Sequence, residues 1–87
     1  MEKILITGCA GFIGFHLCKA LEKNYSVIGV DNMNSYYDKQ LKIDRLKQLP
    51  KNFSFFEIDL KSKKNVTSLF EKNRFDCIFH LAAQAGV

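Results

Sequence analysis

The chain has 87 residues, of which 47% are hydrophobic and 25% charged, with a single proline. This composition is typical of a folded globular protein and excludes a disordered or fibrous chain, while the length allows one small domain with a thin core. The sequence contains no apolar stretch near the roughly 20 residues that cross a bilayer, and its formal net charge of +4 favours a nucleic-acid partner only if the basic residues gather on one face.

The first half of the sequence predicts a strand, a helix and a second strand. Lys3–Thr7 (KILIT) is a β-branched run that stops at a glycine, which is typical of a strand buried on both faces. The segment that follows is predicted to be a helix, which ends at Asn24. Its apolar residues have helical spacing: Ile13, Leu17, Ala20 and Leu21. A second β-branched run, Tyr25–Val30, ends abruptly at Asp31, so we expect another buried strand there.

The second half continues the alternation of helix and strand. After a polar loop at residues 33–38, the predicted elements are a helix at Lys39–Leu49, a strand at Phe53–Ile58, a helix at Lys61–Asn73 and a strand at Phe75–Leu81. Pro50 ends the first of these helices, because proline cannot continue a helix. The apolar stripe of the second helix is formed by Val66, Leu69 and Phe70.

Four apolar strands separated by three amphipathic helices predict an α/β fold with a parallel sheet. Parallel neighbours need crossover helices, and those crossovers are almost always right-handed. The implied connectivity is β-α-β-α-β-α-β with the spatial strand order 3-2-1-4, the N-terminal half of a Rossmann-type doubly wound sheet. We therefore expect residues 1–87 to form a partial, truncated dinucleotide-binding domain.

Three glycines recur every three residues between the first predicted strand and the helix that follows it. Gly8 permits the tight turn, Gly11 lets backbone amides approach a pyrophosphate, and Gly14 allows the helix to pack closely against the sheet. The unpaired amides at the start of the helix then meet the negative charge. A glycine triplet alone is a weak signal, and a packing turn without a ligand is the alternative.

Asp31 strengthens the interpretation of the three glycines as part of a dinucleotide-binding turn. It lies at the end of the second strand, 17 residues beyond Gly14, close to the separation at which an acidic residue reaches the adenosine ribose. Its carboxylate would accept hydrogen bonds from the ribose hydroxyls and repel a 2′-phosphate. The sequence therefore predicts NAD rather than NADP as the cofactor.

Two further polar residues end strands at the same edge. Asp59 follows the third strand and has two interpretations: it accepts a hydrogen bond from the adenine amino group, which we favour, or it caps the next helix. His80, at the end of the fourth strand, invites assignment as a catalytic base. We favour a buried, hydrogen-bonded structural histidine there.

The cysteines and lysines give no sign of a separate function. Cys9, Cys18 and Cys77 match neither a zinc site nor a C-x-x-C pair, so we expect small buried hydrophobes and no metal site. Solvated faces rather than a nucleic-acid surface are expected for Lys39, Lys42, Lys47, Lys51, Lys61, Lys63, Lys64 and Lys72, which alternate with apolar residues. Met1 is not followed by a secretory signal, which predicts a cytoplasmic protein without membrane contact.

Four segments together resemble the extended short-chain dehydrogenase/reductase family, with its NAD-dependent epimerases and dehydratases. They are TGCAGFIG from Thr7 to Gly14, DNMNSYYD from Asp31 to Asp38, FFEIDL ending at Leu60, and IFHLAAQAGV at the end. The resemblance covers the whole chain. Within the family it is greatest to nucleotide-sugar epimerases, and DNMNSYYD and AAQAGV favour the UDP-glucuronate 4-epimerase subgroup.

The resemblance implies NAD as cofactor and gives each site residue a place along it. The pyrophosphate would be wrapped by Gly8, Gly11, Phe12, Ile13 and Gly14. The adenosine ribose would be held by Asp31 and Asn32, with Asn34 and Ser35 bordering the ribose or adenine and Asp59 and Leu60 flanking the adenine. The fourth strand would line the cofactor with Leu81, Ala82 and Ala83, and Gln84 would lie near the nicotinamide and the substrate.

The implied reaction of the intact parent is inversion at C4 of a UDP-sugar by transient oxidation and re-reduction, with the tyrosine of a Tyr-x-x-x-Lys pair as base. No such pair occurs here, since Gln40 and Leu41 stand four residues beyond Tyr36 and Tyr37. We therefore expect the catalytic residues and the substrate subdomain to lie beyond Val87, and none of the 87 residues to be catalytic. The isolated chain is expected to be inactive, marginally stable and weak in binding NAD, and the parent to be a homodimer.

Three other interpretations compete with this one. Nucleotide-sugar dehydratases and decarboxylases of the same family share these opening residues. A dinucleotide-binding module without catalysis would also share them, and the presence of Tyr-x-x-x-Lys in the intact chain would discriminate. Nucleic-acid binding through the lysines would instead predict a steep salt dependence.

Overall fold

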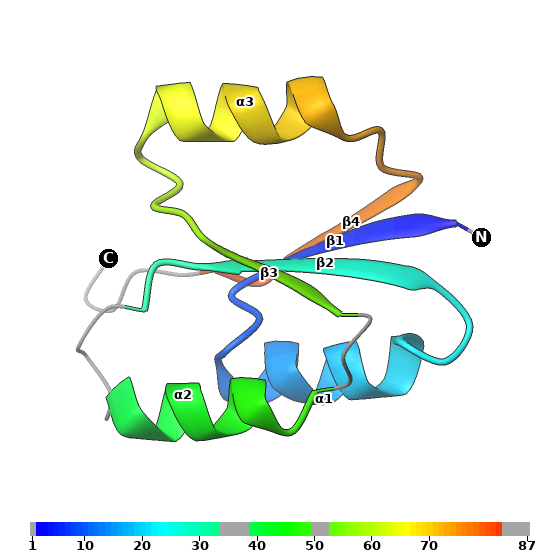
Figure 1. Ribbon diagram of the computed structural model, residues 1–87, viewed down its shortest axis with the longest axis vertical. Coiled ribbons are helices and arrows are strands. Elements are labelled where there is room, and N and C mark those ends of the chain that lie inside the picture. The colour runs from blue at the N-terminus through cyan, green and yellow to red at the C-terminus, as the bar shows by residue number, and fades with distance from the viewer. Residues whose placement is uncertain (1, 34–38, 50–52, 83–87) are drawn as a thin grey trace.

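The computed structural model describes residues 2–33, 39–49 and 53–82 as a three-layer α/β structure. A twisted sheet lies between α3 on one face and α1 and α2 on the other (Figure 1). In chain order the elements are β1 (Lys3–Thr7), α1 (Phe12–Leu21), β2 (Ser26–Asp31), α2 (Lys39–Lys47), β3 (Ser54–Glu57), α3 (Lys63–Lys72) and β4 (Cys77–His80). The predicted elements are all present, with bounds that differ by no more than two residues.

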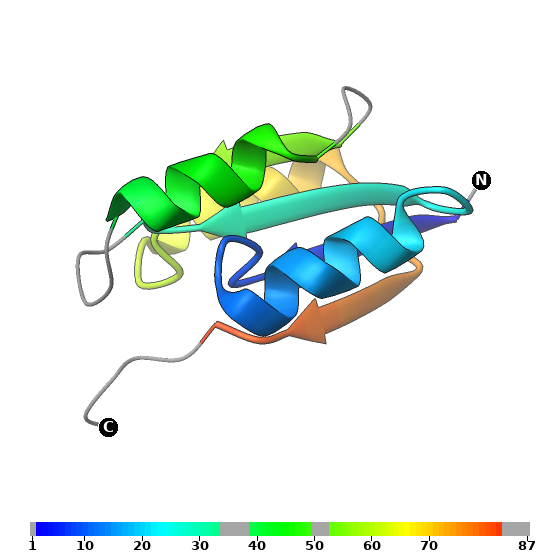
Figure 2. The same ribbon diagram turned by 90° about the horizontal axis from the view of Figure 1, so that it is seen from below.

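The sheet has the predicted topology. Its order is β3-β2-β1-β4, and every neighbouring pair is parallel, with Leu5 of β1 in register with Ile28 on one side and Ile78 on the other. Figure 2 shows α2 over the β2 side of the sheet and α1 over the β1 side. The predicted α/β fold, with the strand order of the first half of a Rossmann sheet, is therefore confirmed.

The sheet separates two hydrophobic clusters. On the α1 side, Ile4 and Ile6 pack with Phe15 and Cys18, and on the α3 side Leu5 packs with Leu69 and residues of β2. Successive side chains of a strand point to opposite faces, so β1 contributes to both clusters. This explains why the whole of its apolar run is needed: Ile4, Leu5 and Ile6 are each at most 4% exposed.

The buried face of α1 differs from the predicted stripe. Ile13 is 68% exposed and Ala20 is also exposed, whereas Gly14, Phe15 and Cys18 are buried. The close approach of α1 to the preceding loop at Gly14 turns this face toward the sheet. In α3, likewise, Leu69 is buried but Phe70 is 46% exposed and makes an edge contact with Phe75.

The strand β4 forms one edge of the sheet, and all four of its residues are exposed. The predictions of burial for Cys77 and His80 are therefore wrong. Burial requires a layer on each face of a strand, and among the described residues no helix covers β4 as α1 and α3 cover β1. Two apolar residues of this edge strand, Ile78 and Phe79, are 48% and 36% exposed.

Candidate functional site

The candidate site lies where β1 and β2 end and a glycine turn leads into α1. Gly8 has a φ of +70°, a left-handed conformation that favours glycine. A Cβ on Gly8 would lie 2.9 Å from the backbone nitrogen of Ala82, which follows β4. The Gly8 and Cys9 amides both donate to the carbonyl of Val30, at 2.8 and 3.2 Å, so the turn is fastened to the end of β2.

The helix α1 starts directly behind this turn. A Cβ on Gly14 would collide with the carbonyl oxygen of Gly8, which accounts for the third glycine of the motif. Gly11 is the N-cap and makes no side-chain cap, while its carbonyl accepts the first helical bond from the Phe15 amide at 2.9 Å. The first-turn amides of α1 therefore have no side-chain cap, an arrangement that suits an anion.

The Asp31 carboxylate is buried at the centre of this region, with the residue 6% exposed. Its Oδ2 accepts a hydrogen bond from the Ala10 amide of the glycine turn at 3.1 Å. Its Oδ1 accepts from the Met33 amide at 2.8 Å and from Lys42 Nζ at 3.0 Å. Asp31 thus links the end of β2, the glycine turn and α2.

Two cations of α2 belong to the site and were missed from the sequence. Lys42 was predicted to be solvated, but it is 6% exposed and forms a salt bridge with Asp31. Arg45 donates from Nη1 to the carbonyl of Ala10 at 3.0 Å and lies 5.9 Å from the centre of the Phe12 ring. The available signal was their spacing of three residues, which places both on one face of a helix.

A second polar join lies between β1 and β4. The Thr7 hydroxyl is 2.8 Å from His80 Nδ1 and accepts a hydrogen bond from the Ala82 amide at 3.1 Å. His80 is therefore hydrogen-bonded, as predicted, although it is exposed rather than buried. This join holds the start of the segment after β4 beside the glycine turn.

Asp59 shapes the turn after β3 and is not the helix cap. Its Oδ1 accepts from the Lys61 amide at 2.9 Å, whereas the N-cap of α3 is Ser62, whose hydroxyl accepts from the Asn65 amide at 3.4 Å. The Ile58 amide donates to the Asp31 carbonyl at 3.1 Å, which brings the end of β3 to the end of β2. The capping interpretation of Asp59 is wrong, and the adenine assignment remains a prediction.

The described site residues therefore lie together at one end of the sheet, where the carboxyl ends of the strands are. The glycine turn brings Gly8, Gly11, Phe12, Ile13 and Gly14 to this end, β2 brings Asp31 and Asn32, and the ends of β3 and β4 bring Asp59, Leu60, Leu81 and Ala82. Phe12 and Ile13 are 66% and 68% exposed.

Some of the predictions from the sequence fall on parts of the chain that the structure does not describe. Four predicted site residues lie outside the described residues: Asn34, Ser35, Ala83 and Gln84. Val87, beyond which we expect the catalytic residues, also lies outside them. The placement of the catalytic residues beyond Val87 therefore stays a prediction, as do the roles of these four residues.

The thiols near the site are not poised for chemistry. Cys9 and Cys18 are fully buried, as predicted. Burial raises the pKa of the Cys18 thiol to about 12 and raises that of Cys9 further from its ordinary value, with Cys18 and Asp31 adding to the shift at Cys9. Both therefore remain neutral packing groups near pH 7.

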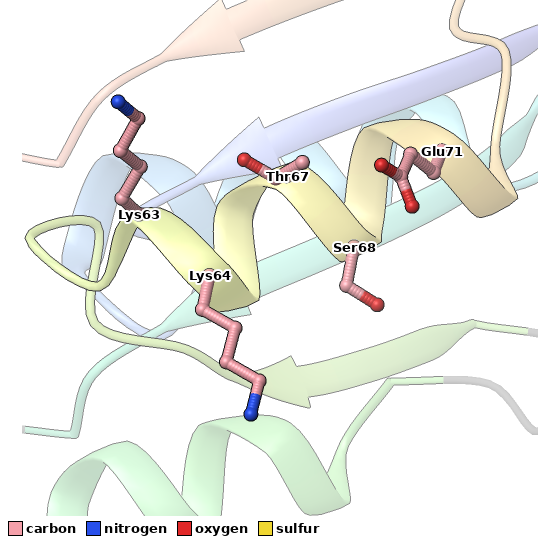
Figure 3. A pocket seen from close by; sticks show the side chains of 5 residues that line it. All are labelled: Lys63, Lys64, Thr67, Ser68 and Glu71. Atoms are coloured by element: carbon pink, nitrogen blue, oxygen red, sulfur yellow. The ribbon is translucent and has the colours of Figure 1, made fainter.

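Other surfaces of the described chain provide no competing site. A shallow hollow on the outer face of α3 is lined by Lys63, Lys64, Thr67, Ser68 and Glu71. Figure 3 shows the two lysine side chains pointing in different directions, so their charges do not converge. Within residues 2–33, 39–49 and 53–82 there is no metal-binding group of His, Cys, Asp or Glu, and no helix there is long and apolar enough to span a membrane.

A parallel sheet whose first strand leads through a glycine turn into a helix, with an acidic residue ending the second strand, defines the Rossmann class of dinucleotide-binding folds. Comparison with known proteins gives the family. The sequence model described as GDP-mannose 4,6 dehydratase matches residues 5–87. The chain therefore belongs to this family of NAD-dependent epimerases and dehydratases.

Relatives and solved structures of the family include several epimerases. The chain is 49% identical to Protein CapI of Staphylococcus aureus and 43% identical to UDP-glucuronate 4-epimerase of Thermodesulfobacterium geofontis, over 98% and 100% of its length. The crystal structure of UDP-glucuronic acid 4-epimerase from Bacillus cereus, in complex with UDP-glucuronic acid and NAD, matches 99% of the chain at 39% identity with a TM-score of 0.83. The chain spans 26% and 28% of the two relatives and 28% of the crystallised chain.

Proposed function

We propose that this chain is the NAD-cradling N-terminal portion of a nucleotide-sugar epimerase. The observation that carries the proposal is the hydrogen bond from the Ala10 amide to Asp31 Oδ2 at 3.1 Å. It joins the turn suited to a pyrophosphate to the carboxylate suited to a ribose, so both halves of the adenosine diphosphate would have their binding groups at one edge. Gly8 and Gly14 allow the turn to keep this shape, because a Cβ at either position would collide with backbone atoms, those of Ala82 at Gly8 and those of Gly8 itself at Gly14.

The residue assignments form part of this proposal. Pyrophosphate oxygens would bind at the uncapped amides of Phe12 and Ile13, within the turn of Gly8, Gly11 and Gly14. Asp31 and Asn32 would hold the adenosine ribose, Asn34 and Ser35 would border it, and Asp59 and Leu60 would flank the adenine. Leu81, Ala82 and Ala83 would line the cofactor beyond β4, with Gln84 toward the substrate.

The proposed reaction of the whole protein is inversion at C4 of a UDP-sugar, with UDP-glucuronate as the substrate. When bound, NAD would supply reversible hydride transfer at C4 of the sugar, and a base would hold the proton of the C4 hydroxyl while the carbon is oxidised. The base would lie beyond Val87, outside these 87 residues. The similarity to UDP-glucuronate 4-epimerases supports this substrate and reaction, and we propose a homodimer for the whole protein.

The test uses the complete protein that carries this chain. It is incubated with UDP-glucuronate and substoichiometric NAD, and the products are resolved by chromatography and NMR. Formation of the C4 epimer, with no net production of NADH, supports the proposal. Absence of NAD binding in calorimetric titration would overturn it.

A second reaction is favoured by the family match, whose description names a 4,6 dehydratase. Dehydration or decarboxylation would begin with the same hydride transfer and would use the same N-terminal cradle. Mass spectrometry of the same incubation discriminates, since an epimer keeps the substrate mass while loss of water or carbon dioxide lowers it. A protein that binds NAD but changes no nucleotide sugar would instead be a non-catalytic dinucleotide-binding module.

A further inference from the structure

We propose that Lys42 is a specificity-determining residue of the ribose subsite. Its ammonium is paired with Asp31 and becomes a ligand for a 2′-phosphate when the Asp31 charge is removed. The inference rests on the proposed function, because it assumes that Asp31 faces the adenosine ribose. It adds a cation to a subsite for which the sequence indicated a carboxylate and neutral polar side chains but no positive charge.

The geometry places the two charges in direct contact. Lys42 Nζ lies 3.0 Å from Asp31 Oδ1, and the two side chains are 8% and 4% exposed. Lys42 reaches Asp31 from α2, an element separate from the glycine turn and from β2. The cation is therefore held beside the carboxylate by the packing of a third element.

The carboxylate is held by donors from three directions. The Ala10 amide binds one oxygen, and the Met33 amide shares the other with Lys42. Asparagine keeps a side chain of similar shape beside Lys42 but has a single acceptor oxygen, so its amide nitrogen faces one group of these donors and at least one hydrogen bond is lost together with the charge. The second change, at Lys42, is therefore compared in the same Asp31→Asn background, where that loss is common to both variants.

The charge balance determines which dinucleotide is accepted. Asp31 and Lys42 together carry no net charge, so exclusion of a 2′-phosphate would depend on the carboxylate, which has no hydrogen to donate to a phosphate. Without the Asp31 charge, a buried ammonium lacks its compensating partner, and a phosphate dianion can supply one. Arg45, whose Nη1 donates to the Ala10 carbonyl, is unchanged in every variant of the test, so it cannot account for a difference that depends on Lys42.

The experiment measures NAD and NADP affinity of the complete protein by calorimetry for wild type, Asp31→Asn, and Asp31→Asn combined with Lys42→Met. We expect Asp31→Asn to raise the affinity for NADP relative to NAD on the order of tenfold. The added Lys42→Met should abolish that gain. Lys47→Met, a change on the same helix, is the matched control in the Asp31→Asn background and should leave the gain intact.

Equal NADP gains with and without Lys42 would overturn the inference while leaving the NAD proposal in place. A wild-type protein that binds no NAD would overturn the proposed function and, with it, the inference. If Asp31→Asn does not fold, Lys42→Met alone decides. With the carboxylate then uncompensated, NADP affinity relative to NAD should fall several-fold, and an unchanged ratio refutes the role of Lys42.

Discussion

Replacing Thr7 by valine tests the polar join between β1 and β4. Valine keeps the shape of the side chain but removes a hydroxyl that bonds His80 Nδ1 at 2.8 Å and the Ala82 amide at 3.1 Å. Each lost hydrogen bond costs about 1 kcal/mol, so we expect about 2 kcal/mol of destabilisation. This value is an upper limit, because Thr7 is 4% exposed but His80 is exposed, so water can replace the hydroxyl at the ring nitrogen.

The contact with the Thr7 hydroxyl also gives an expectation for which ring nitrogen of His80 carries the proton. Because its oxygen already accepts from the Ala82 amide, we expect the hydroxyl to donate its hydrogen to His80 Nδ1, and the neutral ring then to carry its proton on Nε2. Nitrogen NMR of labelled histidine reads this tautomer in wild type, and the preference should weaken in Thr7→Val. Thr7→Ser, which retains the hydroxyl, is the matched control.

Two measurements on the complete protein test the expected destabilisation of Thr7→Val. Chemical denaturation gives the loss of stability, and hydrogen exchange reports the Ala82 amide, which should lose protection in Thr7→Val but keep it in Thr7→Ser. A valine variant that matches wild type in both measurements would show that the hydroxyl does not hold the two strand ends together.

The other predictions concern the turn, the thiols and a helix cap. Gly14→Ala should cost about 1–3 kcal/mol in denaturation, because its Cβ meets the Gly8 carbonyl; an unchanged midpoint would contradict that contact. In the folded 87-residue chain near pH 8, a thiol reagent should label Cys77 rapidly and Cys18 only after unfolding, and equal rates would contradict the burial. Burial raises the pKa of Cys18 from 9.0 to about 12, so the contribution of the neutral thiol to the free energy of unfolding is complete below pH 9 and declines as the pH rises from 9 to 12. Urea titrations should show a weaker decline of that free energy in Cys18→Ala than in wild type. Ser62→Ala should cost about 1 kcal/mol at the start of α3, and no measurable change would mean that the 3.4 Å cap is not effective.

The strands and their order were predictable because local signals agreed. The run Lys3–Thr7 is uninterrupted and β-branched, and strict alternation with helices leaves few parallel topologies. The positions of Gly8, Gly14 and Asp31 followed from chain spacing alone. Each of these signals lies within a short stretch of sequence, so no knowledge of distant packing was required.

The errors concern properties that depend on contacts between distant elements. Lys42 resembles the exposed lysines in sequence, and its burial results from the approach of α2 to Asp31, eleven residues away. Cys77 was predicted to be buried because free cysteine usually is, and His80 because a buried structural histidine was favoured over a catalytic base. Both lie on the outermost strand and are exposed. Ile13 has helical spacing, yet the contact of Gly14 with the turn rotates it outward. Apart from the three-residue spacing of Lys42 and Arg45, no local pattern encodes these relations.

The alternation along β1 has a consequence for how this domain tolerates mutation. Ile4 and Leu5 are neighbours in sequence, but they belong to clusters on opposite sides of the sheet. Substitutions in clusters that share no partners have additive effects on stability. Side chains around Leu69 can therefore diversify while the packing beneath the glycine turn stays as it is, so the two faces can evolve at independent rates.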